Sequence, residues 1–84
     1  MISHRSRSTV RHELKVAERD MARLQELVDR LTDALHVAGT DHEALARIGA
    51  DLASHEAELA TAEEEWLERS AELDEIDASA RGRE

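Results

Sequence analysis

Four cations near the beginning of the chain recur at every fourth position: Arg11, Lys15, Arg19 and Arg23. Residues four apart are neighbours on a helix surface, so these side chains are predicted to line one outward face, with Arg5 and Arg7 continuing the row. Such a row can contact successive phosphates, with an affinity that falls as salt rises. The spacing therefore predicts a site that contacts the phosphates of a nucleic acid.

The same cations have a second interpretation. Glu18, Asp20 and the acidic remainder of the chain could neutralise the row within the protein. No aromatic residues are interleaved with the cations to stack on bases. Contact with phosphate and internal neutralisation both stay open at this point.

Other reactive side chains do not form a recognisable site. The histidines are scattered, and no two stand four residues apart beside a carboxylate, so no metal site is expected: His4, His12, His36, His42 and His55. The serines lack an enclosing pocket and a positioned base, cysteine is absent, and there is no glycine-rich phosphate loop. The sequence predicts a protein that is not an enzyme by itself and needs no cofactor.

The composition indicates helices that carry these side chains. The 84 residues allow one small domain; they contain no proline, and 1% are aromatic, with Trp66 as the single tryptophan. No apolar segment approaches the length of a membrane span, and no secretion signal is visible at the start. Together with the absence of cysteine, this predicts a soluble, cytoplasmic, all-α protein.

Apolar residues alternate at spacings of three and four in both halves of the chain, which is the heptad pattern of a coiled coil. The first seam is Val10, Leu14, Ala17, Met21, Leu24, Val28, Leu31, Leu35 and Ala38, widened by Leu27 and Ala34. The second is Leu45, Ile48, Leu52, His55, Leu59, Ala62, Trp66, Arg69, Leu73 and Ile76.

A short break separates the seams. Gly39 is predicted to end the first helix, and Thr40 with Glu43 to cap the second. The expected domain is an antiparallel two-helix coiled-coil hairpin over residues 10–77, with helices at about 10–38 and 41–77, a turn at about 39–41, and flexible tails at 1–9 and 78–84. Facing residues should have numbers that sum to about 80 to 83, and the helices should be roughly 40 to 55 Å long.

Charge is distributed unevenly along this expected rod. The net charge is −9, but residues 1–24 carry +3 and residues 25–84 carry −12. Only the end that holds the early cations is therefore suited to approach a polyanion.

Two segments, RHEL to MARL at 11–24 and EEEWLERSAEL at 63–73, give a resemblance to the C-terminal coiled-coil domain of ABC-F ATPases. In that family, two ATP-binding cassettes precede a basic linker and an antiparallel helical hairpin. The resemblance implies that this chain is a non-catalytic module of an ATPase whose cassettes lie elsewhere in the parent chain. It also implies contact with DNA or the ribosome through Arg11, Lys15, Arg19 and Arg23.

Two other interpretations stay open. The hairpin could be a spacer or a protein-interaction module, in which Leu27 and Leu67 provide a second face for a partner helix or a homodimer. It could also be a small free-standing protein. The expected state is a monomeric hairpin or a weak homodimer.

Overall fold

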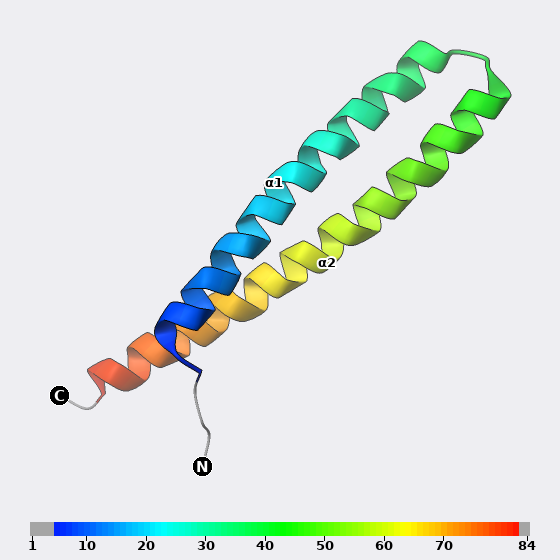
Figure 1. Cartoon of the computed structure of the whole chain (residues 1–84). Helices are drawn as coiled ribbons and strands as arrows, with labels where there is room; N and C mark the ends of the chain where they lie inside the picture. The colour runs from blue at the N-terminus through cyan, green and yellow to red at the C-terminus, as the bar shows by residue number, and fades with distance from the viewer. Residues whose placement is uncertain (1–4, 83–84) are drawn as a thin grey trace.

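Two long helices, lying side by side in opposite directions, make up the protein. The structure is a computed structural model that describes residues 5–82. Helix α1 spans Arg7–Ala38 and helix α2 spans His42–Arg81, and the start of α1 lies beside the last part of α2 at what we call the open end, away from the turn (Figure 1). The predicted all-α hairpin is confirmed.

Both helices extend further than the heptad pattern predicted. Residues 7–9 belong to α1 and residues 78–81 to α2, which corrects the expected tails at 1–9 and 78–84. Residues 1–4 and 83–84 lie outside the described residues. The 32 residues of α1 span about 48 Å, within the predicted 40 to 55 Å, whereas the 40 residues of α2 span about 60 Å and exceed it. The molecule is 64 Å long.

The seam positions lie between the helices. Val10, Ala17 and Leu24 of α1 and Ala62 of α2 are fully buried, and every other predicted seam residue is half-buried. Two helices cover each other along one stripe only, so a hairpin of this kind buries few side chains completely. Small residues at Ala17 and Ala62 allow the backbones to approach where α2 carries its indole.

The turn uses a different cap from the one predicted. Gly39 has a positive φ of 59°, as expected for the residue that ends α1. The N-cap of α2 is Asp41, not Thr40: its carboxylate accepts a hydrogen bond from the backbone N–H of Ala44 at 3.2 Å. A carboxylate here also interacts favourably with the positive end of the helix dipole, which favours aspartate over the neighbouring threonine.

Polar contacts between the helices define their alignment. The indole Nε1 of Trp66 donates to Glu18 Oε1 at 3.1 Å, and Arg7 Nε lies 3.2 Å from Asp77 Oδ1. The numbers in each of these pairs sum to 84, close to the predicted 80 to 83. In the described part of the chain, neither helix combines the length and the apolar character that crossing a membrane requires.

Candidate nucleic-acid interface

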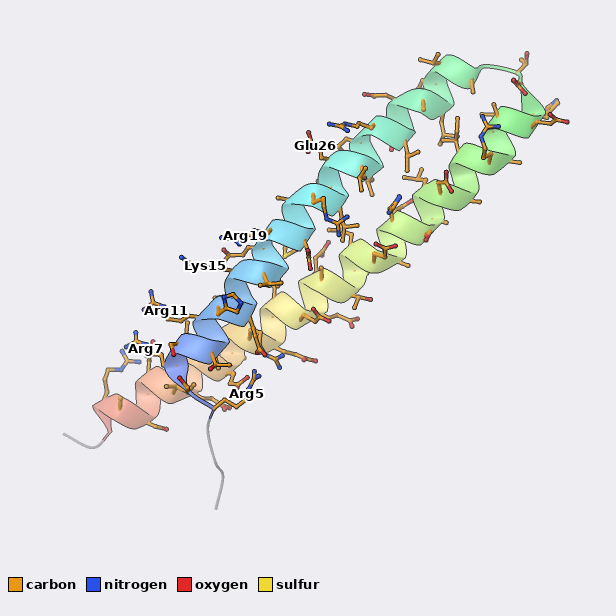
Figure 2. All side chains as sticks on the ribbon, in the orientation of Figure 1. Arg5, Arg7, Arg11, Lys15, Arg19 and Glu26 are labelled. Carbon is orange, nitrogen blue, oxygen red and sulfur yellow. The ribbon has the colours of Figure 1, made fainter. Side chains whose placement is uncertain are left out.

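Three of the four predicted cations gather on the outer surface of α1. Arg11, Lys15 and Arg19, which we call the outward cations, are exposed and project from the side of α1 that faces away from α2 (Figure 2). Within residues 5–82 none of the three forms an ion pair with a carboxylate. Their charges are therefore not neutralised by direct contacts there.

The helix spaces the outward cations regularly. Four residues of α-helix rise about 6 Å, so the three side chains cover about 12 Å along the rod. Farther along the same side lies Glu26, whose carboxylate pairs with Arg30 at 3.1 Å (Figure 2). The cationic surface is thus confined to the half of α1 near the open end.

Arg23 is placed differently from the other three. Its guanidinium lies 3.9 Å from Asp20, at the edge of a groove between the helices that is also lined by Glu58 and Glu65. Each step of four residues turns about 40° around a helix of 3.6 residues per turn, so Arg23 lies about 120° around the axis from Arg11. Asp20 therefore offsets part of the charge of Arg23, although 58% of the arginine side chain is exposed.

Arg5 and Arg7 do not extend the row of unpaired cations as the sequence suggested, because both pair with carboxylates of α2. Arg5 donates twice to Glu72, from Nε at 2.9 Å and from Nη2 at 2.8 Å, and also reaches Glu13 at 2.6 Å. Arg7 pairs with Asp77, as described above. These two arginines join the start of α1 and the chain just before it to the far part of α2.

The contacts of Arg5 belong to a larger group of charges, the open-end cluster, formed by Arg5, Glu13, Arg69 and Glu72. Arg69 lies 3.3 Å from Glu72 and 3.9 Å from Glu13, so it bridges the two helices. Hydrogen bonds to Glu72 and then to Glu13 raise the pKa of Arg5 above its usual value. The hydrogen bond from Arg5 lowers the pKa of Glu13, against a smaller opposing effect of desolvation.

Sequence reasoning missed this cluster. It gave Arg69 a seam position without a partner; in the structure only 26% of the side chain is exposed and the guanidinium meets carboxylates. The available signal was the arrangement of charges: the antiparallel register places Glu13 and Glu72 at the same level, and such a pair requires a cation between its members.

The histidines remain dispersed in the structure. Among residues 5–82, no three His, Cys, Asp or Glu side chains are placed to hold a metal ion. His55 lies in the seam, and its Nδ1 is buried without a hydrogen bond, 3.9 Å from Glu58.

Comparison with known proteins identifies no relative: no protein-family model, no curated protein and no solved structure matches the chain.

Proposed function

We propose that this hairpin is a non-catalytic module that contacts the phosphate backbone of nucleic acid through Arg11, Lys15 and Arg19. The observation that carries the proposal is their common placement: three exposed cations on one side of α1, without ion pairs in the described chain. Arg23 belongs outside this contact, because it lies beside Asp20 and the acidic groove.

The charge of the rest of the molecule defines how the contact would be made. With a net charge of −9, the protein repels a polyanion from most directions, and only the open-end half of α1 offers a favourable approach. Few cations and no aromatic stacking platform mean weak binding that does not distinguish base sequence. The expected contact is therefore an accessory one.

The proposal is tested with a pair of matched variants of the full chain. One replaces Arg11 and Arg19 by Ala, and the other replaces Arg30 and Arg81, which are two arginines outside the outward cations. Affinity for fluorescent duplex DNA and for structured RNA is measured at low salt. We expect the first variant to lose most of its binding and the second to keep it, although both lose the same charge.

Equal loss in the two variants would mean that only total charge matters, and no binding by the unmodified chain would remove the proposal altogether. A further variant, Arg23→Ala, tests the exclusion of that residue. We expect its affinity to lie close to that of the unmodified chain.

Membership of the ABC-F ATPases is part of the same proposal and rests on the resemblance of residues 11–24 and 63–73. It adds the ribosome as a specific target and the ATP-binding cassettes of a parent chain as neighbours. Co-sedimentation with ribosomes, compared with competition by free duplex DNA, tests this part separately. If free duplex DNA displaces the chain from ribosomes as easily as any other polyanion does, the phosphate contact stands but the assignment to the ribosome does not.

A further inference from the structure

The half of the hairpin next to the turn is packed differently from the half at the open end. All the fully buried side chains, Val10, Ala17, Leu24 and Ala62, lie in the open-end half. From residue 25 to residue 61, all of which the structure describes, every seam residue is only half-buried. The turn half therefore has no seam residue that the two helices cover completely, whereas the open-end half has four beside half-buried ones such as Leu14 and Leu73.

The residues beside the seam change character between the two halves. The flank with the groove between the helices carries acidic residues, including Asp20 and Glu65 in the open-end half and Glu58 at the start of the turn half. Seven residues is one heptad, so positions seven or fourteen residues closer to the turn lie on the same flank. From Asp20 these are Leu27 and Ala34 on α1, and from Glu58 they are Asp51 and Ala44 on α2. The flank of α1 thus becomes apolar in the turn half, whereas on α2 only the position nearest the turn, Ala44, is apolar.

The width of the apolar stripe on a helix indicates how many other helices pack against it. A stripe restricted to the seam suits a two-helix coiled coil, whereas a stripe widened by one flanking position suits a helix that packs in a larger bundle. Val37 lies beside the same flank and is 87% exposed. We call the resulting surface the turn-half face: Leu27, Leu31, Ala34 and Val37 of α1, with Ala44 and Ile48 of α2.

We infer that the turn-half face binds the same face of a second copy of this chain, forming a four-helix assembly around a two-fold axis. The surface area of the chain supports this occupant. It exposes 6317 Å², whereas a compact monomer of 9.4 kDa exposes about 5000 Å². The excess of about 1300 Å² comes from the elongated shape of the rod, 64 Å long, and leaves room for the roughly 800 Å² that each partner buries in a standard interface.

Charges at the border of the face also suit a second copy. Arg47 and Asp51 lie one turn apart on α2, and neither forms an ion pair within the described residues. In a two-fold arrangement, contacts occur in reciprocal pairs, so Arg47 of one copy can meet Asp51 of the other and the reverse. The assembly is independent of the outward cations, which lie in the other half of the molecule.

Sedimentation equilibrium of the full chain tests the inference, again with matched variants. Leu27→Lys with Val37→Lys changes the turn-half face, whereas Val16→Lys with Leu67→Lys changes exposed apolar residues of the open-end half. We expect the unmodified chain and the second variant to approach twice 9.4 kDa as concentration rises. The first variant should weaken the dimer by about tenfold or more while keeping its helical circular dichroism.

Because Leu27 is half-buried, Val37→Lys alone is measured as well, and it should weaken the dimer without affecting the hairpin. Reversing one charge, with Arg47→Asp, should also weaken association, and adding Asp51→Arg should restore it. A mass that stays at 9.4 kDa at millimolar concentration would overturn the inference. So would a dimer that the Val16 and Leu67 variant disrupts as strongly as the turn-half variant.

Discussion

At the scale of single residues, the two polar members of the second seam have different environments. The guanidinium of Arg69 meets the carboxylates of Glu13 and Glu72, so its charge is compensated although the side chain is largely covered. The imidazole of His55 has a buried Nδ1 without a hydrogen bond and lies 3.9 Å from Glu58. Arg69 Nε is also buried without a hydrogen bond, but it lies 3.3 Å from a carboxylate oxygen of Glu72, whereas His55 Nδ1 lies 3.9 Å from Glu58. A polar seam residue costs stability unless its polar atoms are paired, so His55 is the weaker of the two positions.

We therefore expect His55→Leu to stabilise the hairpin by about 1 kcal/mol, because it removes an unpaired polar atom and adds apolar contact. Urea unfolding followed by circular dichroism measures the change. His12→Leu is the control, since His12 is exposed and its replacement should leave the free energy of unfolding nearly the same. A His55→Leu variant less stable than the unmodified chain would show that the imidazole makes a favourable contact.

At the scale of the elements, the two helices begin in different ways. The N-cap residue of α1 is Ser6, whose side chain makes no capping hydrogen bond, whereas Asp41 caps α2 through the backbone N–H of Ala44. The start of α1 is instead held against α2 by the ion pairs of Arg5 and Arg7. One helix start thus depends on a local cap and the other on contacts across the hairpin.

Replacement of the α2 cap has a predictable cost. Asp41→Ala should destabilise the hairpin by about 1 kcal/mol, the usual cost of losing an N-cap side chain. Thr40→Ala is the matched control and should have a much smaller effect, because Thr40 is not the cap. The opposite order of the two free energies of unfolding would support the capping box that the sequence suggested.

The open-end cluster makes stability depend on pH. Its hydrogen bond from Arg5 lowers the pKa of Glu13 below the ordinary value of 4.5. A lowered carboxyl pKa stabilises the folded chain fully above the unfolded value, and this stabilisation is lost as pH falls through the folded value. The contribution is therefore present at neutral pH and disappears progressively below about pH 4.5.

Glu13→Gln should accordingly lower Tm at pH 7, and the difference from the unmodified chain should shrink as the pH is lowered past 4.5. High salt should reduce it as well, since the cluster is partly exposed. Glu75→Gln, at an exposed position of α2, is the control and should change Tm little at any pH. A difference for Glu13→Gln that stays constant between pH 7 and pH 3 would contradict this role of the cluster.

At the scale of the whole molecule, the periodicity of the sequence predicted the rod and the residues between its helices, because a heptad repeat determines both helix and seam. It predicted the helix ends at the turn to within one residue, but not those at the open end. Residues 7–9 and 78–81 carry no seam pattern, and their helical state accompanies charge contacts between the helices, such as Arg7 with Asp77. Contacts between residues about 70 positions apart cannot be read from a local pattern.

The sequence predicted only part of the candidate site, because a local spacing pattern does not show which cations pair with carboxylates. Spacing alone grouped four cations, but the row turns around the helix as it rises, and Arg23 lies beside Asp20 at the groove. Adding up the rotation per residue around the helix axis would have shown that Arg23 and Arg11 point in different directions. The pairing of Arg5 with α2 could not have been found this way, because it depends on how the chain enters α1.

The central claim, that three cations on one side of the rod contact phosphates, is tested most directly by the salt dependence of binding to duplex DNA. For the full chain, the logarithm of the association constant is plotted against the logarithm of salt concentration. Three phosphate contacts predict a slope of about −2.7, falling to about −0.9 when Arg11 and Arg19 are replaced by Ala. A slope near zero, or one that this replacement leaves unchanged, would contradict the account.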